Sequence, residues 1–237
     1  MTTYSNDPLS RTWQPGAAAG SIDLQLRSFM LRVFNTMAGG LGLTGIVAYA
    51  AASSGLYAAI AGTPLIWLVM LAPFGLALLL GFRVGQMSPA AAQAAFWSYA
   101  ALMGLSLAGI FLIYTGNSIA RVFFIAAGTF AATAAWGYTT RTDLTRFGSF
   151  LVMGLIGIIL AGLVNLFIGS SALQFALSVI GVVVFTGLTA WDTQRMKTMF
   201  LANGGAGNLA IMGALMLYLD FVNLFVSLLQ VLGTRRD

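Results

Sequence analysis

Long apolar stretches separated by short polar segments dominate this chain, and the pattern predicts membrane-spanning helices. Each of seven stretches is close to the ~20 residues that a helix needs to cross a ~30 Å hydrocarbon core. Polar or glycine-rich connections such as "QMSPAAAQ", "TTRTDLTR" and "LANGGAGN" separate them. The predicted spans are about 33–52, 64–82, 93–114, 120–138, 147–168, 172–191 and 209–232. We therefore expect an all-α polytopic membrane protein.

Composition supports this fold class. Of the 237 residues, 59% are hydrophobic and only 7% are charged, with a mean hydropathy of +0.91, whereas soluble domains carry roughly 25% charged residues. The first 27 residues are polar, rich in Gly, Ala and Pro, and lack the apolar core of a signal peptide. We expect a disordered cytoplasmic tail over 1–27 and a seven-helix transmembrane domain over 28–234.

The distribution of basic residues predicts the orientation. Arginine and lysine gather before the first span and in alternate connections, which places the N-terminus in the cytoplasm. Seven crossings then leave the basic C-terminal residues Arg235 and Arg236 outside. The alternative is a re-entrant seventh segment with both ends inside. The net charge of +5 therefore indicates topology and not a nucleic-acid partner.

Several kinds of chemistry are excluded by the residues that the chain lacks. It has no cysteine and no histidine, and its six acidic residues are all aspartates. Disulfides, thiolate chemistry, zinc sites, histidine-based triads and glutamate general bases are therefore absent. Any proton or metal chemistry has to use aspartate.

Two aspartates lie within or at the end of predicted spans. Asp220 lies about eleven residues into the last span, and Asp192 lies at the cytoplasmic end of the sixth. An ionisable group at mid-membrane costs about 2.5–3.5 kcal/mol on insertion scales, so Asp220 needs a partner or a water-filled path. Asn223 lies one turn further on the same face. The structural alternatives are a protonated Asp220 that ties helices together, an Asp192 paired with Arg195, and Arg83 as an ordinary cationic anchor.

Two segments near the C-terminus, "FTGLTAWDTQRMK" (185–197) and "LYLDFVNLFVSLLQVLG" (217–233), resemble the transmembrane Bax inhibitor motif family in its bacterial branch. "MLRVFNTMAGGLGLTGIVAY" (30–49) and "MSPAAAQAAFWSYAALMGLSL" (87–107) also look like bacterial members, so the resemblance covers roughly 28–234. It implies a seven-helix fold with the last helix central in a bundle of six. It also implies an integral protein of the bacterial inner membrane.

The resemblance further implies a pH-dependent calcium leak. In this family the pH sensor is an aspartate pair from the sixth and seventh helices, with an arginine at the end of the second helix as its partner. The matching positions in this sequence are Asp192, Asp220 and Arg83. Two carboxyl groups in a partly dry site share one proton, since both cannot easily ionise. Once ionised, they and Asn223 offer oxygens for a weakly bound calcium ion. On the spans above, Asp192 lies near the interface and Asp220 nearer the midplane, so the pairing requires the sixth helix to enter deeper, or the seventh to start further out, than hydropathy suggests.

We therefore predict a pH-sensitive calcium leak channel gated by this aspartate pair, with calcium, protons and the bilayer as its partners. An intramembrane aspartyl protease would typically show Gly-x-Gly-Asp and a later Pro-Ala-Leu. Asp220 instead follows "LYL", and no proline occurs after Pro89, so we expect no enzyme. Two alternatives stay open. One is a non-transporting regulator of a membrane partner, such as a quality-control protease or a stress or cell-death pathway, and the other is an ion-coupled carrier.

Overall fold

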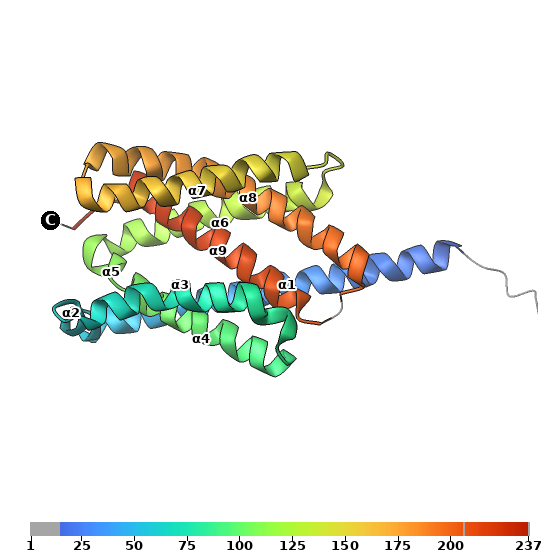
Figure 1. Ribbon diagram of the computed structural model, residues 1–237, viewed down its shortest axis with the longest axis horizontal. Helices are drawn as coiled ribbons and strands as arrows, with labels where there is room; N and C mark the ends of the chain where they lie inside the picture. The colour runs from blue at the N-terminus through green and yellow to red at the C-terminus, as the bar shows by residue number, and fades with distance from the viewer. Residues whose placement is uncertain (1–14, 206, 237) are drawn as a thin grey trace, which may run out of the picture.

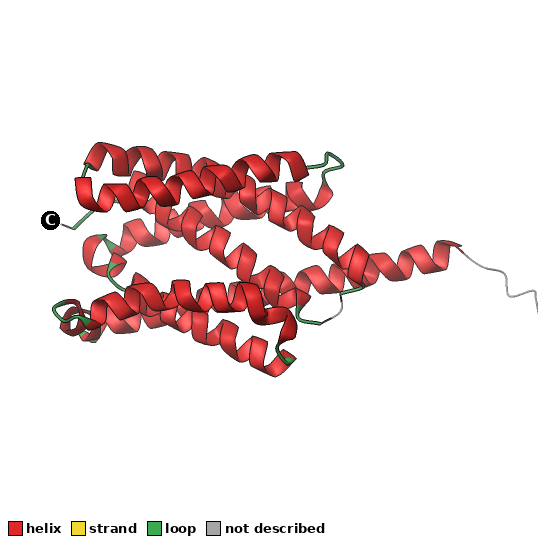
Figure 2. Ribbon diagram, viewed as in Figure 1, coloured by secondary structure: helices red, strands yellow, loops and turns green. Residues whose placement is uncertain are grey.

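The predicted spans form helices in the computed structural model, which describes residues 15–205 and 207–236. Within these residues, seven helical segments are long and apolar enough to cross a membrane, as predicted. Figure 2 shows long helices joined by short loops. The helices are α1 (Pro15–Ser53), α2 (Leu56–Ala61), α3 (Leu65–Arg83), α4 (Pro89–Leu107), α5 (Ile110–Ile113), α6 (Gly116–Thr139), α7 (Thr145–Ile168), α8 (Ser171–Asn203) and α9 (Leu209–Leu232), with a 3₁₀ turn at Val84–Gln86.

Helix boundaries follow from local chemistry. A helix satisfies its backbone polar groups internally, which the bilayer demands. Three helices begin after a hydroxyl residue whose side chain accepts a backbone N–H: Ser88 before α4, Thr115 before α6 and Ser170 before α8. After α8 the chain turns through Gly204, whose φ of 63° lies in the left-handed region that favours glycine.

Helix α9 lies at the centre of the bundle, as predicted for the last helix. It contacts α1, α3, α4, α6 and α8. In Figure 1 the red α9 runs between one group formed by α6, α7 and α8 and another formed by α1, α3 and α4. Its side chains Leu217, Tyr218 and Leu224 are fully buried. The helix is continuous from Leu209 to Leu232, which supports a full crossing and not a re-entrant segment.

One face of α9 is anchored to α1 and α4 by a polar contact. The Tyr218 hydroxyl lies 2.6 Å from Thr44 Oγ1, and Thr44 Oγ1 also lies 2.8 Å from the Ala100 carbonyl oxygen. The Tyr99 ring packs edge-on against Tyr218 at 5.3 Å. Asp220 follows two residues later, roughly 200° around the helix. It therefore points away from this anchor and toward α8.

Two boundaries differ from the prediction. The sixth span, α8, continues to Asn203 instead of ending near 191, because Met196 and Phe200 keep a buried apolar face through a polar stretch. Helix α1 begins at Pro15, so residues 15–27 of the tail that we expected to be disordered are helical. The alanine-rich "GAAAG" favours helix, and Leu26 is buried. The remainder of that tail, residues 1–14, lies outside the described residues.

Asn208 is expected to stabilise the end of the bundle where the turns before α4 and α9 meet. Its buried Nδ2 donates to the carbonyl oxygens of Val84 at 2.7 Å and Met87 at 2.8 Å. Asn208→Ala leaves both carbonyls without this donor, so we expect the free energy of unfolding to fall by about 1–3 kcal/mol. Unfolding in mixed micelles measures it. Asn203→Ala, at an exposed position, is the control, and equal losses for the two variants would contradict this role.

Candidate functional site

The hairpin formed by α8 and α9 brings Asp192 and Asp220 to the same depth. Asp192 lies eleven residues before the end of α8 at Asn203, and Asp220 lies eleven residues after the start of α9 at Leu209. The helices are antiparallel and joined by a short turn, so residues equally far from the turn lie opposite one another. Eleven residues span about 16 Å, which is roughly half of a ~30 Å hydrocarbon core.

The two carboxyl groups form a buried pair. Asp192 is 7% exposed and Asp220 is 4% exposed. Their side chains lie within hydrogen-bonding reach of one another. Among the described residues, Asp192 Oδ1 and Asp220 Oδ2 have no hydrogen-bond partner. Such a pair can hold one proton between two oxygens and still offer two more oxygens to water or to a cation.

Two glycines fix the part of α8 that carries Asp192. A Cβ atom on Gly137 of α6 would overlap the backbone of Ala190, and one on Gly148 of α7 would overlap the indole of Trp191. Both neighbours directly precede Asp192 in the chain. Because α6 and α7 approach α8 this closely, the backbone at Asp192 has little freedom to move, and its side chain is held toward α9.

An apolar layer closes the side of the pair that faces the α8–α9 turn. Met196 and Phe200 lie one and two turns beyond Asp192 on α8, and both are buried. Phe200 packs against Phe29 of α1 with ring centroids 4.9 Å apart. Met196 fits against Gly213 of α9, where a Cβ would lie 2.7 Å from its sulfur atom. The aspartates are therefore separated from the end of the bundle that carries the α8–α9 turn by packed side chains.

The opposite side of the pair leads to a polar cluster that sequence reasoning missed. Gln174 Nε2 and the Ser178 hydroxyl both donate to Gln230 Oε1, and Asn165 Nδ2 donates to Gln174 Oε1. A polar side chain, Ser227, also lies against Gly181 between this cluster and the aspartates. The sequence does carry a signal for this cluster, because polar residues within α8 and within α9 are spaced three or four residues apart and so share one face of each helix.

The other predicted site residues are not all brought to the pair. Arg83 is exposed at the end of α3, beside the turn that precedes α9, and Asp220 lies about 16 Å along α9 from that end. The cation whose charge acts on Asp192 is Arg195, three residues further along α8. Asn223 is half-buried, and its Nδ2 donates to the Leu219 carbonyl within α9 at 2.8 Å. The roles of Arg83 and Asn223 stay predictions.

The ligand set indicates what kind of ion the pair could hold. Within the described residues, no group of three or more His, Cys, Asp or Glu side chains is placed to bind a metal. Two carboxylates fall well short of the six to eight oxygens that calcium takes. The pair can therefore offer only a weak site in which most of the ligands are water, which suits passage of an ion better than storage.

Comparison of the sequence with known proteins identifies its family. The family model described as "Inhibitor of apoptosis-promoting Bax1" matches residues 26–237. An uncharacterized protein of Rickettsia prowazekii (strain Madrid E) is 49% identical over 221 residues, covering 92% of this chain and 94% of the relative. The inner membrane protein YbhL of Escherichia coli (strain K12) is 43% identical over 218 residues, covering 89% and 93%. The chain is an integral membrane protein that belongs to the Bax inhibitor family.

Proposed function

We propose that this protein is a pH-sensitive calcium leak channel of the bacterial inner membrane, gated by protonation of the Asp192–Asp220 pair. The observation that carries the proposal is a pair of buried carboxyl groups on neighbouring helices, one of them at the middle of α9, a helix long and apolar enough to cross a membrane. Chains seldom place ionisable groups at this depth without a role in a proton or ion pathway. The name of the E. coli relative, inner membrane protein YbhL, supports the inner membrane as the location.

The proposed gate works by a change of charge. With one proton shared, the pair carries a single negative charge, and α8 and α9 pack tightly. Loss of the proton leaves two adjacent negative charges that repel each other in a low-dielectric site. Separation of the two helices then admits water and a cation, whose charge offsets the repulsion. Opening also requires Met196 and Phe200 to leave the apolar layer that they form with Phe29.

A non-transporting regulator is the second candidate. The observation that favours it is the same apolar layer, because the packed side chains of Phe29, Met196 and Phe200 leave the aspartates closed from the cytoplasmic end. In this role, protonation of the pair would change the shape of the bundle, and a membrane partner would respond to that change. Such a protein carries no ions when it is purified alone.

The two candidates are separated by reconstitution. Purified protein is placed in liposomes that contain a calcium-sensitive dye, and calcium is added outside. A channel raises the dye signal above that of empty liposomes without any other protein. A signal equal to that of empty liposomes at every pH from 6 to 8 would contradict the channel and favour the regulator.

The two aspartates are expected to act as one unit. Asp192→Asn removes one member of the pair, so replacing Asp220 as well should add little further loss of flux. Expressed as free energies, the losses of flux in the two single variants should add up to more than the loss in the double variant. We expect this difference, the coupling energy, to be about 1–3 kcal/mol. Initial rates of calcium entry for both single variants and the double variant measure it. Losses that simply multiply would show that the two residues act independently.

A further inference from the structure

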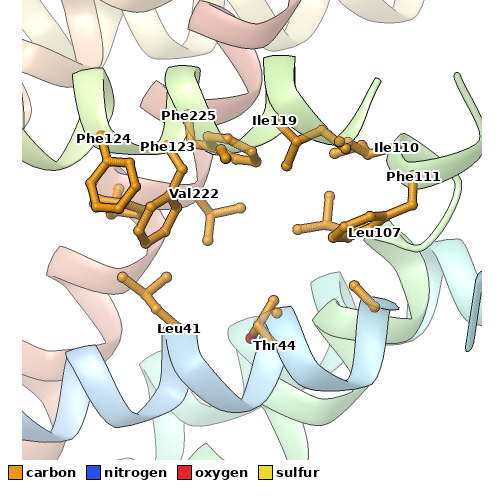
Figure 3. A pocket seen from close by; sticks show the side chains of 15 residues that line it. Leu41, Thr44, Leu107, Ile110, Phe111, Ile119, Phe123, Phe124, Val222 and Phe225 are labelled. Atoms are coloured by element: carbon orange, nitrogen blue, oxygen red, sulfur yellow. The ribbon is translucent and has the colours of Figure 1, made fainter. Parts of the chain in front are cut away.

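An apolar cavity opens on the side of the bundle, away from the aspartate pair. Its volume is about 290 Å³, and almost all of its wall is carbon. Leu41 and Thr44 of α1 form one wall, and Figure 3 shows them across a gap from Phe123 of α6 and Phe225 of α9. The cavity therefore lies between three membrane-spanning helices, α1, α6 and α9, and is completed by residues of α4 and α5.

The cavity is open toward the lipid. Gly45, Gly116 and Ala120 line it and are exposed, and Phe124 at its edge is 72% exposed. No Cβ is present at the two glycines to narrow the opening. The surface around this opening faces the hydrocarbon region, where acyl chains are the surrounding solvent. Water is not a suitable occupant, because a buried water needs two to four polar partners.

The C-terminal tail is fixed beside one end of this cavity. Thr115 N–H donates to the Thr234 carbonyl at 3.1 Å, and Arg236 N–H donates to the Ile113 carbonyl at 2.9 Å. Thr234 N–H also donates to Ser118 Oγ at 2.8 Å. These contacts hold the tail on the loop between α5 and α6. The residues on either side of that loop line the cavity: Ile110, Phe111, Gly116 and Ile119.

The fixed tail carries two exposed cations. Arg235 lies opposite Tyr114 in an antiparallel pairing, and both Arg235 and Arg236 are exposed. With seven crossings they lie on the outer side of the membrane, where arginine is uncommon near the end of a span. A backbone held by three hydrogen bonds therefore places two exposed arginines beside the α5–α6 loop, whose flanking residues line the cavity. Guanidinium groups bind phosphate through paired N–H donors.

We propose that this cavity holds one acyl chain of an anionic phospholipid from the outer leaflet, with the phosphate bound by Arg235 and Arg236. The apolar wall alone selects no lipid, because bilayer chains are as apolar as the cavity. Selection comes from the charge of the headgroup. The site thus gives the basic tail a function on the outer side and stabilises the junction of α1, α6 and α9.

Lipid binding by the purified full-length chain tests the proposal. Native mass spectrometry is used to titrate the detergent-solubilised protein with phosphatidylglycerol and, separately, with neutral phosphatidylcholine of the same acyl chains. We expect tighter binding of phosphatidylglycerol. The double variant Arg235→Gln/Arg236→Gln should lose about thirtyfold in affinity for it, since each arginine contributes roughly fivefold at an anionic surface. Phosphatidylcholine binding should fall less, because the choline cation offsets the charge of its phosphate.

A second variant fills the cavity, with a matched control on the same helix. A Cβ added at Gly45 or at Gly42 meets no atom within 4 Å, so both replacements fit the fold, but only Gly45 lines the cavity. Gly45→Leu should weaken phosphatidylglycerol binding by at least about tenfold, and Gly42→Leu should not.

Equal affinity of the wild type for the two lipids would overturn the proposal, and so would equal lipid binding by Gly45→Leu and Gly42→Leu. A dimer that Gly45→Leu disrupts would also overturn it, because the cavity would then be occupied by a second copy of the chain.

Discussion

Replacement of Asp220 by asparagine is expected to reduce calcium flux through the protein by at least about tenfold, a change of roughly 1.4 kcal/mol in the barrier. Asparagine has the shape of a protonated aspartic acid but cannot ionise. The pair therefore carries at most one negative charge, that of Asp192, at every pH. Two adjacent negative charges can no longer form, and neither the repulsion that separates α8 from α9 nor the attraction for a cation develops. Initial rates of calcium entry into liposomes at equal protein density measure the effect.

The matched control is Asp143→Asn, the same chemical change outside the membrane. Asp143 lies in the loop between α6 and α7, where its Oδ1 accepts the Thr145 hydroxyl at 2.6 Å and the Thr145 N–H at 2.9 Å. These hydrogen bonds lower the pKa of Asp143. Its carboxylate therefore stays ionised from pH 6 to pH 8, so Asp143→Asn should leave the flux and its pH dependence unchanged. Equal flux for Asp220→Asn and Asp143→Asn would contradict the gate.

The second large effect is expected at Gly137, which touches neither aspartate. A Cβ at this position would overlap the Ala190 carbonyl group, two residues before Asp192. Gly137→Val therefore has to push α6 and α8 apart, because backbone atoms cannot rotate away as a side chain could. Overpacking of this kind costs typically 1–3 kcal/mol and occasionally more. We expect a loss of about 3 kcal/mol in unfolding free energy, together with loss of pH-dependent flux.

Gly128→Val separates this packing effect from the intrinsic cost of valine in a helix. Gly128 lies in the same helix, is exposed, and has no atom within 4 Å of a Cβ. Both replacements carry the same change in helix propensity, so the difference between them reports the contact with α8. Equal stability of the two variants in mixed micelles would show that α6 does not hold α8 in this position.

The sequence predicts the existence of the seven spans well, because each is a long apolar run. It predicts the end of the sixth span poorly. The segment after Trp191, "DTQRMKTM", is polar on average, so hydropathy ends the helix there. The structure shows that a buried stripe of Met196 and Phe200 continues the helix to Asn203. Helical spacing of three to four residues between such apolar positions marks a buried face even where mean hydropathy is low.

That boundary decides whether the aspartate pair can be predicted from geometry. With a helix that ends near residue 191, Asp192 lies at the interface and Asp220 lies deeper. With the observed end at Asn203, both are eleven residues from the turn and lie opposite each other. The position of Arg83 relative to the pair depends on how α3 packs on α9. This packing cannot be predicted from a single sequence. The polar cluster around Gln174 and Gln230 likewise requires three helices to be placed together.

The central claim is that one shared proton on Asp192 and Asp220 controls passage of calcium. Protons and calcium compete for the same oxygens, so each must weaken the binding of the other to the same extent. Higher calcium therefore favours the deprotonated pair and should move the midpoint of the pH profile to lower pH. A structural carboxyl pair without a role in permeation would show no such shift.

The most direct test is the pH profile of calcium flux in liposomes from pH 6 to pH 8, measured at two calcium concentrations for the wild type and for Asp192→Asn/Asp220→Asn. The account predicts a wild-type flux that varies with pH, a midpoint that moves to lower pH at the higher calcium concentration, and a flat profile for the double variant. The same pH profile in both proteins would contradict it, as would a wild-type flux no greater than that of empty liposomes.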